Sequence, residues 1–220
     1  MDGKLIVFEG VEGAGKTTQM QQLIHWLQAS CFLITSVVAT REPGGTELGK
    51  GLRQLLLLQG SGELVSERAE LLMYAADRAQ HVETFLKPQL ASGAIVLCDR
   101  FTDSTIAYQG YGRGLNLNLI NQLNEIATGG LQSDLTFWLD INVEAGLERV
   151  RARGEFDRIE QADIEFHRRV QQGFADLAAE NPDRIIRINA DRTESEVAEE
   201  IQAILISRLE AWGYLKKFAS

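Results

Sequence analysis

Residues 10–17 read GVEGAGKT and stand between the apolar run LIVF at residues 5–8 and a helix-like pattern that continues to residue 30. This order of strand, glycine-rich turn and helix fits G-x-x-x-x-G-K-[ST], in which backbone N–H groups surround a phosphate chain. In that motif Lys16 reaches the β and γ oxygens, and the Thr17 hydroxyl suits Mg²⁺. A chance glycine-rich turn is the alternative, but it would not require the flanking strand and helix. The sequence therefore predicts a nucleoside triphosphate site.

The size and charge of the chain limit the classes of protein to consider. Its 220 residues fit one domain, and 45% hydrophobic with 24% charged residues is ordinary for a globular protein. The net charge of −9 argues against a nucleic-acid polymer as partner, because binding a phosphate backbone needs a basic surface. Of the 22 basic residues 16 are arginines, which suits small phosphorylated ligands.

Several features indicate a cytoplasmic protein without a membrane span. The chain has no apolar run near the roughly 20 residues that a span requires. The first strand begins after residues 1–4, which leaves no room for a signal peptide. Cys31 and Cys98 stand alone without metal-ligand spacing, which favours two reduced thiols over a disulfide.

Apolar β-branched runs alternate with helical periodicity along the whole chain, which predicts a mainly parallel sheet covered on both faces. Strands are expected at residues 5–9, 34–39, 94–98, 135–140 and 184–188. Helices are expected near residues 16–30, 47–58, 66–91, 116–127, 143–153, 161–180 and 194–212. No repeat, low-complexity tract or linker divides the chain, so we expect a single domain over residues 1–220.

Ligands of open parallel sheets bind beyond the carboxyl ends of the strands, so those ends are the places to look for chemistry. Asp99 ends the third apolar run and suits a Mg²⁺-bound water near the phosphate loop; a helix N-cap is the alternative. Arg100 follows directly, and Arg41 ends the second strand. Two arginines at this edge predict a clamp for a second phosphate-bearing substrate.

Two further patterns bear on the site. Residues 149–158 close a helix with arginines, break at Gly154 and resume with mixed charge; we interpret them as a mobile flap over a triphosphate, or as cations at a helix C-terminus. Tyr74 and Arg78 are spaced i, i+4 on one helical face, where they could stack on and bond a base. In isolation that pair is more often core plus surface.

Five motifs together resemble the thymidylate kinase family. They are EGVEGAGKTT at residues 9–18, TREPGGT at 40–46, DRF at 99–101, AYQG at 107–110 and RARGEFDRIE at 151–160. The likeness runs from about residue 4 to residue 210, and the combination is specific. It is closest to the bacterial type, because the flap carries arginines and Gly13 stands where the eukaryotic type has a basic residue.

The resemblance implies ATP-dependent phosphorylation of dTMP to dTDP, in dTTP synthesis, with Mg²⁺ as cofactor and usually by a homodimer. It implies a three-layer P-loop NTPase fold with a five-stranded, mainly parallel sheet flanked by helices and a small mobile lid at about residues 150–161. ATP would bind at Gly10, Val11, Glu12, Gly13, Ala14, Gly15, Lys16, Thr17, Thr18, Arg151 and Arg153. The dTMP would bind at Glu12, Arg41, Tyr74, Arg78, Arg100, Thr105, Tyr108 and Gln109. The catalytic set would be Lys16, Arg41, Arg100, Arg153 and Glu12, with Thr17 and Asp99 serving the metal.

Individual roles also follow from the resemblance. Glu12 would approach the deoxyribose 3′-hydroxyl, and Tyr74 would stack on thymine where phenylalanine is common. Arg78 would bond the base carbonyl and Thr105 the ring N–H side, while Tyr108 would crowd the 2′ position. The lid residue Arg153, together with Arg151 and Arg158, would place positive charge over the transferring phosphoryl group or stack on adenine.

Two alternatives stay open at this point. A kinase for another acceptor, such as a nucleoside or a different monophosphate, would differ in the base pocket. A nucleotide-dependent switch of the GTPase kind would read guanine through N-K-x-D, and no such motif occurs in the chain.

Overall fold

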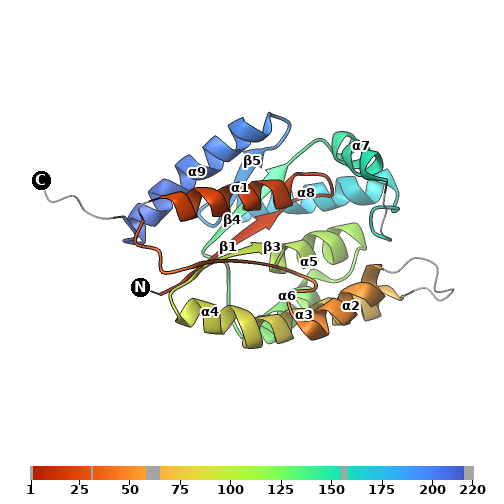
Figure 1. The fold of residues 1–220 in the computed structure, drawn as a ribbon. Coiled ribbons are helices and arrows are strands. Elements are labelled where there is room, and N and C mark those ends of the chain that lie inside the picture. The colour runs from red at the N-terminus through yellow and green to blue at the C-terminus, as the bar shows by residue number, and fades with distance from the viewer. Residues whose placement is uncertain (1, 31, 58–64, 155–157, 216–220) are drawn as a thin grey trace, which may run out of the picture.

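The computed structural model describes residues 2–30, 32–57, 65–154 and 158–215, apart from the side chain of residue 153. Five strands form one sheet in the order β2-β3-β1-β4-β5, and all four pairings are parallel (Figure 1). The strands are β1 (Lys4–Glu9), β2 (Val37–Arg41), β3 (Ile95–Asp99), β4 (Leu135–Asp140) and β5 (Ile185–Asn189). The predicted five-stranded α/β fold is thus confirmed.

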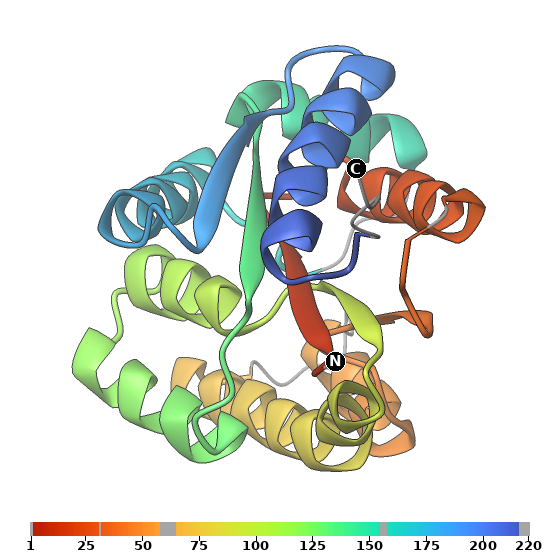
Figure 2. The same ribbon diagram turned by 90° about the vertical axis from the view of Figure 1, so that its left-hand side faces the viewer.

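Helices connect the strands and cover the sheet. They are α1 (Lys16–Ala29), α2 (Glu47–Leu57), α3 (Glu67–His81), α4 (Lys87–Ala91), α5 (Thr102–Thr105), α6 (Leu117–Thr128), α7 (Val143–Arg153), α8 (Ile164–Glu180) and α9 (Glu194–Ala211), with the π-helical segments η1 (Val82–Leu86) and η2 (Ile106–Gly112). Helices α1 and α9 lie side by side over one face, and α4, α5 and α8 lie over the other (Figures 1 and 2). Helix α3 packs between α2 and α6 on that second side.

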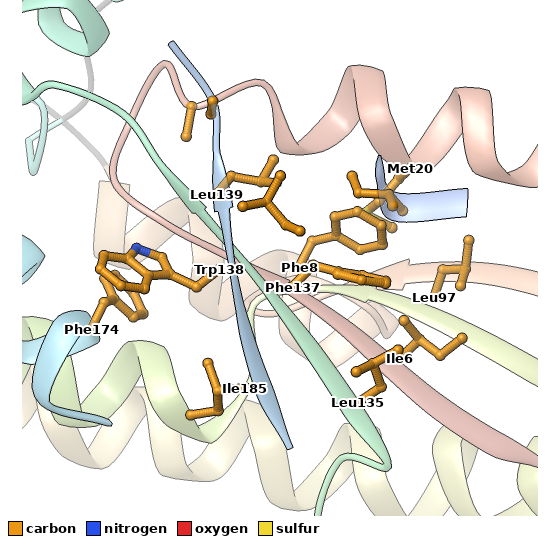
Figure 3. Packing of buried hydrophobic residues seen from close by; sticks show 14 of the residues in the cluster. Ile6, Phe8, Met20, Leu97, Leu135, Phe137, Trp138, Leu139, Phe174 and Ile185 are labelled. Carbon is orange, nitrogen blue, oxygen red and sulfur yellow. The ribbon is translucent and has the colours of Figure 1, made fainter. Parts of the chain in front are cut away.

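Alternation along the strands divides the core into two parts, because successive side chains of a strand point to opposite faces. Ile6 and Phe8 pack in the larger cluster with α1 and α9, whereas Leu5 and Val7 pack against η1. In Figure 3 the ring of Phe8 lies against Phe137 of β4, at 5.5 Å between centroids. Trp138, which follows Phe137 in β4, points to the opposite face of the sheet. There its ring stacks on that of Phe174 in α8 (Figure 3).

Two elements begin three residues later than the sequence predicts, and one predicted helix contains a different kind of turn. Strand β2 begins at Val37 rather than residue 34, because its pairing with β3 starts where Val37 meets Ile95. The predicted helix 66–91 is continuous but contains the π-helical segment η1. Helix α8 begins at Ile164 rather than residue 161, because the Asp163 side chain accepts from the Phe166 N–H and caps it there.

One helical segment was missing from the prediction altogether. Residues 102–112 form α5 and the wider turns of η2, and i→i+5 turns do not follow the 3.6-residue period on which the prediction relied.

Two other expectations concern cysteines and membranes. Cys98 is buried and carries a free thiol, whereas Cys31 falls outside the described residues. In the parts of the chain that the structure describes, no helix has both the length and the apolar character needed to cross a membrane.

Candidate active site

A cavity of about 750 Å³ opens beyond the carboxyl ends of the central strands. It is the place where open parallel sheets bind ligands, because strand-end loops converge there. Fifteen of the predicted site residues line it: Glu12, Gly13, Ala14, Gly15, Lys16, Thr17, Thr18, Arg41, Tyr74, Arg78, Asp99, Arg100, Thr105, Tyr108 and Gln109. The structure thus brings the phosphate loop together with the strand-end arginines and the Tyr74–Arg78 face.

The phosphate loop joins β1 to α1 and holds its lysine with backbone carbonyls. Lys16 Nζ donates to the carbonyl oxygens of Gly10 and Val11 at 3.0 and 3.1 Å. These two residues therefore serve the loop through their backbone, although they do not line the cavity. Burial and the nearby Arg100 guanidinium lower the pKa of Lys16 to about 8, although nearby carboxylates act to raise it. The negative charge of a bound phosphate would raise the pKa of Lys16 and stabilise its ammonium form.

Gly13 has a physical reason to be glycine in this chain. Its φ is +74°, and a Cβ built there would lie 2.1 Å from the carbonyl oxygen of Gly146 in α7. The loop therefore leans directly on α7, and Arg149 of the same helix donates to the Gly13 carbonyl oxygen at 3.3 Å. A basic side chain at position 13 would not fit in this arrangement.

Glu12 belongs to the phosphate loop by sequence but to the opposite wall by its contacts. Its Oε1 accepts from Arg100 Nη2 at 3.0 Å and from the Tyr108 hydroxyl at 2.6 Å. His167 of α8 lies behind it, with Nδ1 3.5 Å from Glu12 Oε2. Burial alone would raise the pKa of Glu12, but His167, Arg100, Lys16 and Tyr108 outweigh burial and lower it to about 2. The Glu12 side chain is therefore an anion at neutral pH.

Arg100 is placed by a bend in the backbone at the end of β3. Its φ is +70°, and among the described residues no other non-glycine has a positive φ. Buried Glu9 holds the following turn, because its Oε1 accepts from the N–H groups of Phe101 and Ser104 at 2.8 and 3.1 Å. Burial raises the pKa of Glu9 to about 7 despite the nearby Arg100. The guanidinium of Arg100 lies over the Tyr108 ring, 4.8 Å from its centroid.

The far wall of the cavity is built around Arg78 of α3, which is only 2% exposed. Its Nη1 donates to Thr105 Oγ1 at 2.9 Å and to Asn124 Oδ1 at 2.7 Å, and its Nη2 donates to the Phe101 carbonyl oxygen at 3.0 Å. Gln109 is also fixed, because its amide donates to buried Glu70 at 2.9 Å. This wall presents polar groups held in set directions, which suits a flat, hydrogen-bonding ring.

The residues predicted to serve the metal meet at the same cavity. Thr17, which is exposed, and Asp99, the last residue of β3, both line it. Asp99 Oδ1 is buried and has no hydrogen-bond partner among the described residues, and the N-cap of α5 is Phe101 rather than Asp99. A hydroxyl and an uncommitted carboxylate beside a phosphate site fit Mg²⁺, which keeps several waters and uses few protein ligands. The described residues contain no cluster of three or more metal-binding side chains.

Of the predicted flap arginines, Arg151 and Arg158 have described side chains, and their surroundings differ. Arg151 is exposed on α7 and does not line the cavity, and the side chain of Arg153 is not among those described. Arg158 makes an ion pair with Glu70 of α3, and its Nε donates to the Leu56 carbonyl oxygen at 3.1 Å. In this structure Arg158 therefore lies on the α2–α3 side of the cavity, and Arg149 is the α7 arginine beside the phosphate loop.

Several cavity residues were missed by the sequence reasoning. They are chiefly Arg53 and, after β5, Ala190, Arg192, Thr193, Glu194 and Val197, whereas Arg149 and Glu160 belong to the stretch predicted as the flap and lid. Arg53 donates to the Pro43 carbonyl oxygen at 3.1 Å, next to the strand-end Arg41. Nothing in the sequence after β5 distinguishes it from an ordinary turn.

The fold and this cavity define a class of protein. The protein has a parallel sheet with a phosphate loop after β1, a carboxylate at the end of β3, and further arginines that line the same cavity. This arrangement describes a P-loop phosphotransferase with two substrates.

Comparison with known proteins narrows that class. A family model described as thymidylate kinase matches residues 8–201. Among similar curated proteins, thymidylate kinase of Nostoc punctiforme is 64% identical, over 93% of this chain and 96% of that protein. Thymidylate kinase of Trichodesmium erythraeum is 60% identical, over 98% of this chain and all of that protein. The crystal structure of thymidylate kinase from Ehrlichia chaffeensis is 37% identical, with a TM-score of 0.76 over 93% of this chain.

The chain belongs to the thymidylate kinase family. It is a phosphotransferase that phosphorylates dTMP to dTDP with ATP as the donor. The alternative of a nucleotide-dependent switch is thereby set aside.

Proposed function

We propose that the two substrates divide the cavity between them, with ATP on the phosphate loop and dTMP against the wall formed by α3, α5 and η2. The observation that carries this proposal is the position of Glu12. It lies four residues before Lys16, yet its carboxylate is held by Arg100 and Tyr108 of the opposite wall. The loop thus reaches both substrates, with Lys16 toward the ATP phosphates and Glu12 toward the sugar of dTMP.

Phosphoryl transfer needs in-line positioning and positive charge spread over the transferring group. We infer that Lys16 contacts the β and γ oxygens and that Arg41 and Arg100 hold the phosphate of dTMP. Arg53, which also lines the cavity beside Arg41, is a further candidate for that phosphate. Glu12, an anion at neutral pH because its pKa is about 2, keeps Arg100 oriented toward the reacting oxygens.

The wall around Arg78 offers a donor and an acceptor side by side. Arg78 presents N–H groups, and Thr105 Oγ1 accepts one of them while keeping a second lone pair. A thymine ring presents a carbonyl next to an N–H, which complements this order; cytosine presents an amino group and a bare nitrogen, which does not. Tyr74 would stack on the ring, Gln109 would contact it from η2, and Tyr108 would exclude a 2′-hydroxyl.

Mg²⁺ is proposed as the cofactor, held through Thr17 and Asp99. When bound, it would neutralise charge on the β- and γ-phosphates. Asp99 Oδ1 supports this assignment because it is buried and uncommitted. Removal of divalent ions with EDTA should abolish ADP formation, and adding Mg²⁺ back should restore it.

We further propose one kinase domain over residues 1–220 with a lid at about 150–161, of which residues 155–157 lie outside the described part. Arg151 and Arg153 would act on ATP when the lid closes. Arg158 would reach the phosphates only after leaving Glu70. Closure would also exclude water and so suppress hydrolysis of ATP.

A homodimer in the cytoplasm is the proposed form of the protein. Large apolar side chains are exposed on α2, α3 and α6, which pack against one another. They are Leu48, Leu55, Leu72, Leu117, Leu119 and Ile126. Light scattering of the purified protein should give twice the 24.5 kDa mass of one chain, and Ile126→Asp should shift it toward the monomer.

An acceptor comparison tests the proposed division of the cavity. ADP release is measured in a coupled assay with dTMP, dCMP and dGMP, for the wild type and for Arg78→Ala. The variant should mainly raise the KM for dTMP, by about 10-fold to 100-fold, because a hydrogen bond to a charged group is lost. An equal loss with every acceptor, or equal turnover of dCMP and dTMP by the wild type, would contradict a base-reading role for Arg78.

A further inference from the structure

We propose that Glu42 and His81 are positioning residues for Arg78 and thereby determine selectivity for the acceptor base. The inference rests on the proposed role of Arg78 and adds two residues that the cavity argument did not use. Glu42 follows Arg41 at the end of β2, and His81 ends α3; their side chains are 3% and 0% exposed. Glu42 also lines the cavity, but Arg78 and His81 engage both of its carboxylate oxygens, and His81 does not line the cavity.

The two residues form one buried chain of hydrogen bonds that ends on Arg78. Thr40 Oγ1 lies 2.7 Å from His81 Nε2, His81 Nδ1 lies 2.8 Å from Glu42 Oε1, and Arg78 Nε donates to Glu42 Oε2 at 2.8 Å. A histidine tautomer with its proton on Nδ1 satisfies both contacts of His81, because it donates to Glu42 and accepts from the Thr40 hydroxyl at Nε2. Both oxygens of the Glu42 carboxylate are therefore used, one for each partner.

This chain limits what Arg78 can do. A guanidinium has five N–H donors, and four of those of Arg78 are taken by Glu42, Thr105, Asn124 and the carbonyl oxygen of Phe101. One N–H on Nη2 has no acceptor among the described residues, and Arg78 lines the cavity wall. The anion of Glu42 also balances the buried cation, so Arg78 has less need of a second anion such as a phosphate. The result is a cation that offers the acceptor base one donor in one direction.

Neighbouring residues also hold His81, and with it this chain of hydrogen bonds, in place. A Cβ added to Gly45 would lie 2.6 Å from His81 Nε2, so the loop after β2 closes directly over the imidazole. The ring of Phe85 in η1 also stacks on the imidazole, at 5.5 Å between centroids. His81 can therefore neither swing away nor exchange its partner for water without moving that loop.

Glu42→Gln tests the inference, because glutamine keeps the shape but has a single acceptor oxygen for two donors. We expect the KM for dTMP to rise about 10-fold to 100-fold, as for loss of a hydrogen bond to a charged group. The kcat and the KM for ATP should change little, and the ratio of kcat/KM for dTMP over dCMP should fall. Glu47→Gln is the matched control: it makes the same substitution on the exposed surface of α2 and should leave all these values unchanged.

A double-mutant comparison separates positioning from general damage. If Glu42 acts through Arg78, then Glu42→Gln should raise the dTMP KM in the wild type but add little in the Arg78→Ala background. An equal effect in both backgrounds would overturn the inference. If Arg78→Ala itself leaves the dTMP KM unchanged, the proposed role of Arg78 fails. If only Arg78→Ala raises it, that role stands and the positioning inference is wrong.

His81 variants provide a second measurement should Glu42→Gln fail to fold. His81→Asn keeps an N–H in reach of Glu42, whereas His81→Leu removes both polar contacts. Thermal unfolding is followed for each, so that kinetics are compared only between folded proteins. We expect His81→Asn to bind dTMP more tightly than His81→Leu in calorimetric titration. Equal affinities of these two variants would contradict the inference.

Discussion

The two halves of the cavity are built in different ways. The phosphate loop is eight consecutive residues, and backbone carbonyls hold its lysine. The acceptor wall takes its side chains from α3, α5, η2, α6 and the loop after β2, and these side chains hold one another. The loop is therefore built mainly from its own strand and helix, with α7 packed against it at Gly13. The wall exists only when the whole second side of the molecule is folded.

This difference predicts that substitutions in the loop affect catalysis and that substitutions in the wall affect recognition and stability. The largest expected effect tests the prediction for the loop. Lys16→Ala should lower kcat by about 1000-fold, because a charge contact to the transferring group is lost. The Kd for dTMP, measured by calorimetry, should stay within about threefold of the wild type. A loss of dTMP affinity as large as the loss of kcat would show that loop and wall are not separable.

Glu12→Gln is the variant that can break the comparison, because Glu12 lies in the loop but contacts the wall. If contacts outweigh sequence position, the KM for dTMP should rise by about tenfold or more while the KM for ATP changes little. Steady-state kinetics with each substrate varied in turn would measure both. If only the KM for ATP changed, Glu12 would act with the phosphate loop and not with the acceptor wall.

The pH dependence of ATP use probes the loop alone. The pKa of Lys16 is lowered to about 8, so the free protein loses this cation as the pH rises through that value. Because kcat/KM reports the free enzyme, kcat/KM for ATP should fall about tenfold for each pH unit above about pH 8. Calorimetric binding of dTMP over the same range serves as the comparison. An ATP profile that stays flat to about pH 10 would contradict the shifted pKa.

Two glycine-to-alanine substitutions compare the effect on protein stability of a crowded position next to His81 with that of an open position in α2. Gly45→Ala would place a Cβ 2.6 Å from the His81 ring, so it should lower the free energy of unfolding by about 1–3 kcal/mol. Gly51→Ala in α2 meets nothing within 4 Å and should raise it by about 1 kcal/mol through helix propensity. Urea unfolding of both proteins would measure the difference. Equal destabilisation by the two would mean that the close contact carries no cost.

The same contrast explains how much the sequence could predict. The phosphate loop was recognisable because its residues are consecutive and its flanking strand and helix are required by the motif. All five strands were predicted within a few residues, because burial on both faces gives continuous apolar runs. Arg78 and Tyr74 could be paired by helical spacing, but only family resemblance gave them a ligand.

What the sequence could not provide was the contact between elements distant in the chain. By sequence alone, the three histidines fall in predicted helices and would be surface or core residues. His25 is exposed as expected, and His81 and His167 are buried, but the latter two touch Glu42 and Glu12. No local pattern marks a histidine that faces a carboxylate 39 residues away in the chain. By sequence, Glu9 is the last residue of a strand and the first residue of the phosphate-loop motif. Its hydrogen bonds to the turn after Arg100 are likewise contacts between distant parts of the chain, which no local pattern predicts.

The π-helical segment η2 has a consequence for how chain length can vary in this fold. Each of its turns closes one residue later than an α-helical turn, so Ile106–Gly112 holds more chain than a regular helix would over the same rise. In most helices, deletion of one residue rotates every later side chain by about 100° around the helix axis. In η2, the same deletion would convert the wide turns into regular α-helical turns, and the chain beyond would keep its position. Tyr108 and Gln109 would then rotate away from the cavity, so a shortened relative would retain the fold but meet its acceptor with different side chains.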